Sequence, residues 1–83
     1  MPDVKIYTTA VCPYCVAAKR LLTARGIPYT EQDVSRDDAK RTWLVEATGR
    51  RTVPQIFIGD QSIGGYDDLS ALDQSGKLAE MLK

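Results

Sequence analysis

The feature that most constrains the fold of this chain is a change in hydrophobic period across two closely spaced cysteines. Residues 4–8 alternate apolar and polar side chains and are rich in branched and aromatic residues, which predicts a β-strand. From Tyr14 onward the apolar residues recur at helical spacing until Gly26, where we expect the helix to stop. Cys12 and Cys15 therefore lie between a strand and a helix, with Cys12 at the helix N-terminus.

The rest of the chain continues this alternation of strands and helices. The expected elements are, in chain order, a polar strand over residues 29–34 suited to a sheet edge, a helix opened by a Ser35–Asp38 capping box and ended at Gly49, a hairpin over residues 55–63, a helix over residues 66–74, and a last apolar turn from Leu78 to Leu82. This order combines a parallel βαβ crossover with a late antiparallel hairpin. We therefore predict an α/β fold with a four-stranded mixed β-sheet flanked by α-helices, in the order β-α-β-α-β-β-α.

The apolar positions of the later helices predict which sides face the sheet. In the second helix Ala39, Trp43 and Ala47 form one stripe, with Trp43 expected in the core or at its rim. In the third helix Leu69 and Leu72 are expected to face inward.

The length and composition of the chain limit its class. With 83 residues it has room for one domain, predicted over residues 1–83, and its 43% apolar and 27% charged residues are those of an ordinary globular protein. Eleven basic residues balance eleven acidic ones, so no overall field attracts nucleic acid or a membrane surface. The start lacks a secretory leader pattern and no stretch is long enough to span a bilayer, which predicts a cytoplasmic location.

The two cysteines are spaced for reversible disulfide chemistry. Residues at i and i+3 of a helix start share one face, close enough for a disulfide without movement of the backbone. The helix dipole and the unpaired amides at the N-terminus favour the Cys12 thiolate and lower its pKa, which suits a nucleophile. Cys15, one turn inside, suits the resolving role, and Pro13 stiffens the first turn.

The cysteine pair could also have a structural or a metal-binding role. Free cysteines often act as small buried hydrophobes, so the pair could belong to the core. A zinc or iron–sulfur site needs further soft ligands, yet the chain has no histidine and no third cysteine, so we predict no metal. A C-x-x-C segment between a strand and a helix of a βαβ unit favours the redox role. Lys19 either adds positive potential near the thiols or is a solvated surface residue.

Three ordered motifs give the chain a resemblance to a known family. The segment Cys12-Pro13-Tyr14-Cys15 is followed by Thr52-Val53-Pro54 before the third strand and by Gly64-Gly65-Tyr66-Asp67-Asp68 before the next helix. In this order they resemble the three glutathione-contacting segments of bacterial dithiol glutaredoxins, and the match covers nearly the whole chain. The resemblance implies the thioredoxin fold and a glutathione-dependent thiol–disulfide oxidoreductase with Cys12 and Cys15 as catalytic residues.

The resemblance also implies how glutathione binds. Val53-Pro54 would form a cis peptide bond, which would place the Val53 backbone beside the cysteines to pair with the cysteinyl part of glutathione. The helix start at Gly65 would hold the γ-glutamyl end, because backbone amides attract its carboxylate and Asp67 can accept from its ammonium group. Asp68 is expected only to cap this helix, whereas Asp67 is expected to do both. The substrate-binding residues predicted in this way are Tyr14, Thr52, Val53, Pro54, Gly65, Tyr66, Asp67 and Arg41.

Two departures from the family pattern affect this assignment. Many relatives carry a lysine where this chain has Thr9, and some carry an extra cysteine where it has Tyr66. Without the lysine, the glycyl carboxylate of glutathione is left to Arg41, Arg50 or Arg51. The alternative for these arginines is a solvated helix end that interacts favourably with the dipole.

The predicted function is therefore the reduction of protein disulfides and glutathione mixed disulfides by a monomeric enzyme. Glutathione is the reducing co-substrate and no bound cofactor is expected; the protein partners are disulfide-bearing or glutathionylated proteins, with a ribonucleotide reductase as one candidate. One rival is a donor reduced by thioredoxin reductase, which the segment from Gly64 to Asp68 argues against. Another is a module in which two chains and two glutathiones share an iron–sulfur cluster through Cys12, which the stiff Pro13 loop disfavours.

Overall fold

A computed structural model describes residues 2–83, so that Met1 of the predicted domain 1–83 lies outside the described residues. The elements are β1 (Val4–Thr8), α1 (Pro13–Ala24), β2 (Thr30–Asp33), α2 (Asp38–Thr48), β3 (Gln55–Ile58), β4 (Gln61–Gly64), α3 (Tyr66–Ser75) and α4 (Lys77–Met81). The predicted order of strands and helices is confirmed, except that the last apolar turn is a separate short helix. Gly76 separates it from α3 with a left-handed backbone, φ +80°.

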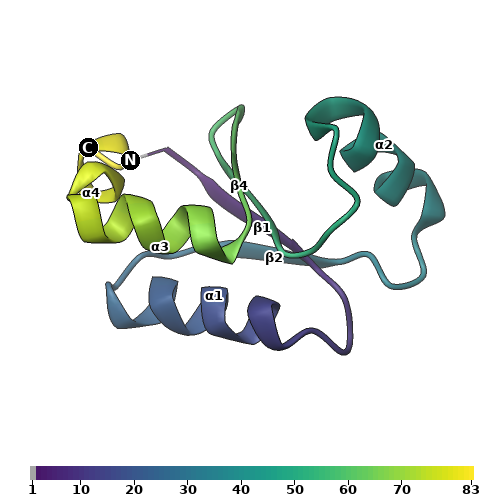
Figure 1. Cartoon of the computed structure of the whole chain (residues 1–83), viewed down its shortest axis with the longest axis horizontal. Helices are drawn as coiled ribbons and strands as arrows, with labels where there is room; N and C mark the ends of the chain where they lie inside the picture. The colour runs from purple at the N-terminus through teal and green to yellow at the C-terminus, as the bar shows by residue number, and fades with distance from the viewer. Residues whose placement is uncertain (1) are drawn as a thin grey trace.

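The four strands form one mixed sheet in the order β2-β1-β3-β4 (Figure 1). β1 runs parallel to β2 and antiparallel to β3, and β3 and β4 form the predicted antiparallel hairpin. The polar strand β2 lies at the sheet edge, as its sequence predicted, since an edge strand buries fewer of its side chains. The strand that precedes the cysteines is therefore held by a neighbour on either side.

The helices cover the two faces of the sheet unequally. α1, α3 and α4 lie over one face, where Ile6, Leu22, Ile56 and Leu69 are fully buried (Figure 1). α2 covers the other face, over a smaller core formed by Tyr7, Val34, Leu44 and Phe57. Successive β1 side chains point to opposite faces, so Ile6 joins the first core and Tyr7 the second. This arrangement places the start of α1 at the carboxyl end of β1.

The prediction for α2 is wrong in two respects. The N-cap is Asp37, whose carboxylate accepts from the Lys40 amide at 3.0 Å, while the predicted cap Ser35 instead accepts from the Ala10 amide at 2.7 Å. A capping group must reach a free amide within the first turn, and Asp37 is the one placed to do so. The inward residue of the helix is Leu44.

The predicted apolar stripe of α2 does not form the buried face. Ala39 and Ala47 are exposed, and Trp43 lies at the rim with 42% of its surface exposed, stacked on Phe57 at a centroid distance of 5.8 Å. Leucine buries far more apolar surface than alanine, so the helix orients Leu44 toward the sheet. Of the two predicted positions for Trp43, the core or its rim, the structure shows the rim.

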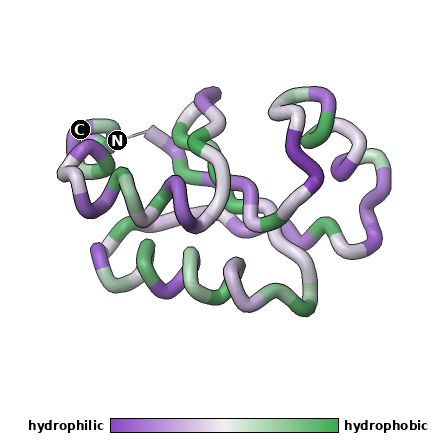
Figure 2. The backbone as a smooth tube through the Cα atoms, viewed as in Figure 1, coloured by the Kyte–Doolittle hydropathy of each residue, from purple (hydrophilic) through white to green (hydrophobic). Residues whose placement is uncertain are grey.

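The helical C-terminal region contributes to the larger core. Leu69 is fully buried and Leu72 partly buried, as predicted, and Leu78 and Leu82 close the core at 2% and 9% exposure. Figure 2 shows the most hydrophilic colour along the connection between α2 and β3, where arginines follow one another. Among residues 2–83 no helix has the length and apolar character needed to cross a membrane.

Candidate active site

The cysteine pair forms a disulfide at the N-terminus of α1. Cys12 is the N-cap, Pro13 is the first helical residue, and the two cysteine Cα atoms are 5.2 Å apart. The Cys15 amide donates to the Cys12 Sγ at 3.1 Å, so the sulfur replaces the usual capping oxygen. Cys15 is 1% exposed whereas Cys12 is partly exposed. Only one of the two sulfurs is therefore open to a partner from solution.

The Val53-Pro54 backbone lies directly opposite the dithiol. The Val53-Pro54 peptide bond is cis, as the resemblance implied. The Val53 carbonyl oxygen is 3.7 Å from the Cys12 Sγ, which brings together residues 41 positions apart in sequence. A chain that approached Cys12 would thus meet the Val53 backbone beside the sulfur.

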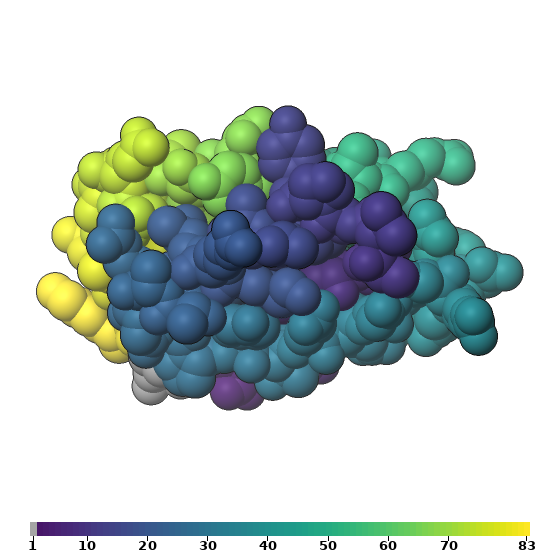
Figure 3. Space-filling view, turned by 90° about the horizontal axis from the view of Figure 1, so that it is seen from below, coloured from purple at the N-terminus to yellow at the C-terminus, as the bar shows by residue number. Residues whose placement is uncertain are grey.

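A groove of about 250 Å³ extends from this point between the start of α1, the segment before β3 and the start of α3. Its lining residues are Tyr14, Arg50, Thr52, Val53, Pro54, Gly65, Tyr66, Asp67 and Asp68. The groove therefore gathers every predicted substrate-binding residue except Arg41. Figure 3, seen from below, shows the connection between β1 and α1 at the molecular surface.

Tyr14 and Tyr66 both line the groove, and their rings lie beside each other. Their ring centroids are 6.2 Å apart with an interplanar angle of 33°. Tyr14 is 63% exposed, so it does not share the burial of Ala18 and Leu22 further along the same helix. Its ring lies against that of Tyr66 at the start of α3 instead of in the core.

Arg41 lies in a neighbouring cavity of about 270 Å³. This cavity is also lined by Arg51 and shares Arg50, Thr52 and Val53 with the groove. The two hollows are therefore adjacent, and the arginines surround their junction. Arg41 and Arg51 line only the neighbouring cavity, whereas Arg50 lines both hollows.

Asp68 caps α3, and its partners differ from those of Asp67. The Asp68 Oδ2 accepts from the Gly65 amide at 3.0 Å and from the Arg50 Nη1 at 2.9 Å. These two bonds, the amide first, hold the pKa of the Asp68 carboxyl below its usual range. The Asp67 carboxylate is exposed and makes no side-chain hydrogen bond within residues 2–83, so the capping half of its predicted dual role is not present.

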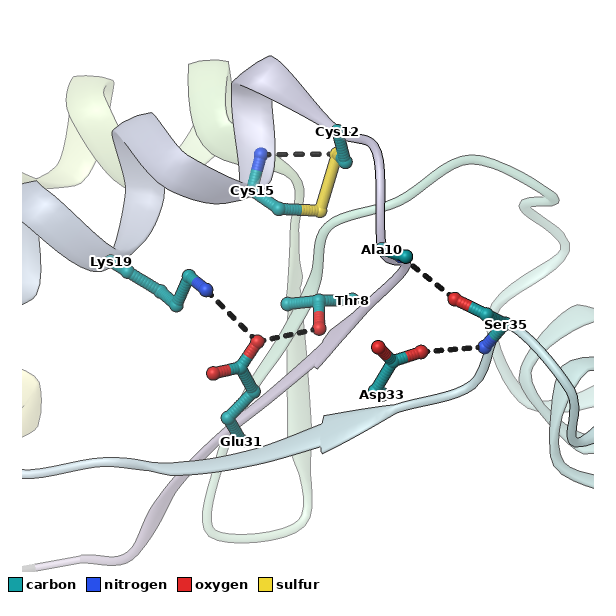
Figure 4. A network of polar contacts seen from close by, with 8 residues as sticks. All are labelled: Thr8, Ala10, Cys12, Cys15, Lys19, Glu31, Asp33 and Ser35. Carbon is teal, nitrogen blue, oxygen red and sulfur yellow. Dashed lines mark hydrogen bonds and ion pairs between the residues drawn. A yellow bond between two sulfur atoms is a disulfide. The ribbon is translucent and has the colours of Figure 1, made fainter.

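A polar network lies on the sheet side of the dithiol (Figure 4). The Thr8 hydroxyl donates to the Glu31 Oε2 at 2.7 Å, and the Lys19 Nζ lies 3.0 Å from the same oxygen. These contacts, the Thr8 bond first, lower the pKa of Glu31. Lys19 thus forms an ion pair with Glu31, and the Glu31 carboxylate offsets much of the positive potential that Lys19 would add near the thiols.

A second network shapes the segment that carries Val53, and it could not be predicted from local sequence. Gln55 is 2% exposed; its amide nitrogen donates to the Arg50 carbonyl at 2.8 Å and its Oε1 lies 2.9 Å from the Thr48 hydroxyl. The Arg50 amide donates to that hydroxyl at 3.1 Å. The only signal in the sequence was a polar residue that directly follows Pro54 and opens an otherwise apolar strand.

The fold and the site together define a class. A C-x-x-C disulfide at a helix N-terminus, faced by a cis-proline segment on a four-stranded mixed sheet, is the arrangement of a dithiol oxidoreductase with the thioredoxin fold. The buried sulfur and the open sulfur match the division of work that thiol–disulfide exchange requires.

Comparison with known proteins refines this class. The glutaredoxin family model matches residues 4–63. Glutaredoxin 3 of Escherichia coli strain K12 is 49% identical over 83 residues, 100% of both chains. A solved structure of a buckwheat glutaredoxin–glutathione complex superimposes with a TM-score of 0.92 at 33% identity, covering 98% of this chain and 76% of that one. The solution structure of a glutaredoxin from Brucella melitensis gives a TM-score of 0.89 at 49% identity, covering 100% and 90%.

The chain belongs to the glutaredoxin family. It is a thiol–disulfide oxidoreductase with the thioredoxin fold, and Cys12 and Cys15 are the dithiol pair of its active site.

Proposed function

We propose that this glutaredoxin reduces protein disulfides and glutathione mixed disulfides, with glutathione as its reducing co-substrate and no bound cofactor. The observation that carries the proposal is the groove that begins where the Val53 carbonyl lies 3.7 Å from the Cys12 Sγ. A disulfide held there would have one sulfur in line with Cys12 while its peptide arms lay along the groove.

The exchange with a glutathionylated protein proceeds in two balanced steps. The Cys12 thiolate attacks the glutathione sulfur, forms a Cys12–glutathione disulfide and releases the protein thiolate, which takes up a proton. A second glutathione thiolate then attacks the same glutathione sulfur, which yields oxidised glutathione and restores the Cys12 thiolate. Cys12 alone is sufficient for this route.

Reduction of a protein disulfide needs both cysteines. Cys12 attacks one sulfur of the target, and the Cys15 thiolate then attacks Cys12, which releases the reduced protein and closes the Cys12–Cys15 disulfide. Two glutathione molecules reopen that disulfide and leave as oxidised glutathione. The 1% exposure of Cys15 supports the resolving role, since a target in solution reaches Cys12 first.

Glutathione is proposed to lie along the groove with its cysteinyl backbone paired to Val53. Its γ-glutamyl carboxylate would accept from the backbone amides at the start of α3, near Gly65 and Tyr66, and Asp67 would accept from its ammonium group. The exposure of the Asp67 carboxylate supports that second contact. Thr52, Pro54 and Tyr14 would line the path between the two ends.

Arg41 is proposed to receive the glycyl carboxylate. It lines the adjacent cavity with Arg51, and both cavities share Thr52 and Val53. Arg50 is already paired with Asp68, which supports Arg41 over Arg50 for this contact.

We further propose that residues 1–83 act as one monomeric domain in the cytoplasm. Leu69, Leu78 and Leu82 lie beyond residues 4–63 yet pack in the same core as β1, which supports a single unit. The proposed protein partners are disulfide-bearing or glutathionylated proteins, and a ribonucleotide reductase is one candidate target. The proposal includes no interaction with nucleic acid or membranes, in line with the balanced charge of the chain.

The experiment that tests these roles is turnover of two substrates by two variants. With a glutathionylated peptide and glutathione, Cys12→Ser should lose activity, whereas Cys15→Ser should retain it. With a protein disulfide as substrate, Cys15→Ser should also lose most of its activity. Loss of the first activity in Cys15→Ser with retention in Cys12→Ser would overturn the assignment.

A further inference from the structure

We propose that Arg50 and Asp68 form a positioning pair that holds the two walls of the glutathione groove in register. One wall is the segment Thr52–Pro54 before β3, and the other is the start of α3 at Gly65. The inference rests on the proposed use of the groove for glutathione. In it, Arg50 and Asp68 position the walls of the groove, and neither residue binds glutathione itself.

The pair adds a side-chain link between two segments that flank the β3–β4 hairpin, one before β3 and one after β4. The Arg50 Nη1 lies 2.9 Å from the Asp68 Oδ2, and the same oxygen accepts from the Gly65 amide at 3.0 Å. Arg50 precedes the first wall by two residues, and Gly65 begins the second. One carboxylate oxygen thus connects the two sides of the groove.

The backbone of Arg50 is itself fixed, so the ion pair acts on an ordered segment. Its amide donates to the Thr48 hydroxyl at 3.1 Å and its carbonyl accepts from the Gln55 side chain at 2.8 Å. Gln55 is 2% exposed and follows Pro54 directly. A displacement of Arg50 would therefore move the cis-proline segment with it.

A third segment is fitted to the pair at Gly64, the last residue of β4. A Cβ at Gly64 would lie 2.2 Å from the Asp68 Oδ2 and 2.8 Å from the Arg50 Nη1, and its backbone has φ +101°. Only glycine leaves room for the pair at that position. The fold thus provides space for this contact where β4 passes into α3.

The Gly65 amide, and after it Arg50, hold the pKa of the Asp68 carboxyl below its usual range, so both contacts favour its charged form. Both side chains remain substantially exposed, at 52% for Arg50 and 42% for Asp68. Exposed ion pairs contribute little to global stability. The effect of breaking the pair should therefore appear in groove geometry more than in folding.

The test compares three reductants in wild-type protein and the Arg50→Met variant, with one small glutathione-free disulfide as substrate. Glutathione and γ-glutamylcysteine both use the γ-glutamyl wall, whereas 2-mercaptoethanol uses neither wall. We expect Arg50→Met to lower kcat/KM about fivefold for glutathione and γ-glutamylcysteine, and to leave it unchanged for 2-mercaptoethanol. Arg50→Lys should restore part of the loss, because it keeps the charge.

The matched control is Arg25→Met. Arg25 pairs with Asp73 at 2.9 Å, its side chain is 56% exposed, and it lies outside the groove, so this variant should keep wild-type values with all three reductants. Asp68→Asn should resemble Arg50→Met, and the double variant should be no worse than Asp68→Asn alone, because both single changes break one contact.

Each remaining outcome would overturn the pairing role. A loss with glutathione but not with γ-glutamylcysteine would make Arg50 a ligand of the glycyl carboxylate. An equal loss of kcat/KM with 2-mercaptoethanol would show that Arg50→Met acts on Cys12 itself. If Arg50→Met had the same kcat/KM values as Arg25→Met, Arg50 would have no role in the groove. If the wild-type protein shows no preference for glutathione over 2-mercaptoethanol, the proposed function fails as well.

Discussion

At the scale of single residues, the polar side chains near the dithiol are engaged in specific pairs. Glu31 on the edge strand receives the hydroxyl of Thr8, which is 1% exposed, and the ammonium group of Lys19. Within residues 2–83 no buried side-chain nitrogen or oxygen lacks a hydrogen-bond partner. Because Glu31 is bonded by a hydroxyl donor and an ammonium group, its carboxylate contributes to stability in its charged form.

The pKa of Glu31 leads to a prediction on acid stability. Because the Thr8 hydroxyl and then Lys19 lower it below the ordinary value of 4.5, the folded state favours ionised Glu31. This stabilisation is fully present above that value and is lost as pH falls through the lower folded-state pKa. The difference in unfolding free energy between wild type and Glu31→Gln should be constant near neutrality and shrink below pH 4.5. Urea denaturation across this range measures it, and a pH-independent difference would contradict it.

A second prediction concerns Gly64. Gly64→Ala combines a positive φ with a Cβ that would lie 2.2 Å from the Asp68 carboxylate, whereas Gly59 has φ +59° and open space around it. Strain of this kind costs about 1–3 kcal/mol per residue. We expect Gly64→Ala to lower the free energy of unfolding more than the control Gly59→Ala does. Equal losses in the two variants would show that the close approach to Asp68 has no energetic weight.

At the scale of elements, the connection between α2 and β3 is held by side chains rather than by regular structure. Gln55 bridges the Arg50 carbonyl and the Thr48 hydroxyl, and both contacts are at the end of α2. In the sequence, the cis-proline segment that faces Cys12 lies between Arg50 and Gln55. The position of this segment therefore depends on a buried amide in the first residue of β3.

Gln55→Leu should test that dependence. The substitution keeps the approximate size of the side chain but leaves the Arg50 carbonyl without its partner, a loss of about 1–3 kcal/mol for a buried polar group. We expect a lower free energy of unfolding in urea, together with a lower kcat/KM for glutathione. Gln61→Leu, on the exposed part of β4, is the control and should change neither quantity appreciably. Wild-type behaviour of Gln55→Leu would refute the structural role.

At the scale of the whole molecule, stability depends on one larger core and one smaller one. The larger core includes Leu78 from α4, at 2% exposure, although α4 lies far from the dithiol in sequence. A domain of this size buries a modest share of its surface, and its stability is expected to be about 4–12 kcal/mol. Single core residues at the C-terminus therefore carry a large part of the total.

Leu78→Ala should accordingly cost about 2–5 kcal/mol and lower the melting temperature clearly. Val11→Ala is the control, because Val11 is 91% exposed and its truncation removes little packing. Thermal unfolding followed by circular dichroism measures both. A melting temperature for Leu78→Ala equal to that of Val11→Ala would show that α4 is not needed for the fold.

Much of the fold was predictable because its signals are local. The alternation in β1, the helical spacing after Cys12 and the hairpin over residues 55–63 each depend on neighbours within a few residues. The inward face of α2 was predicted wrongly, because Leu44 was chosen by the surface that Tyr7 and Phe57 present and not by any period in the helix itself. The Asp37 cap was missed for a related reason, since several nearby oxygens compete for the same amides.

The sequence by itself determined where the dithiol lies, which cysteine opens the helix, and which motifs accompany it, because spacing along a helix and the residue types at its start are local properties. Only the tertiary structure decided what surrounds the dithiol. Three features depend on segments that are distant in sequence or lie in different elements. They are the approach of the Val53 carbonyl to Cys12, the Arg50–Asp68 pair and the burial of Gln55. Such contacts depend on how the strands are ordered and how the helices pack, and no local pattern encodes that geometry.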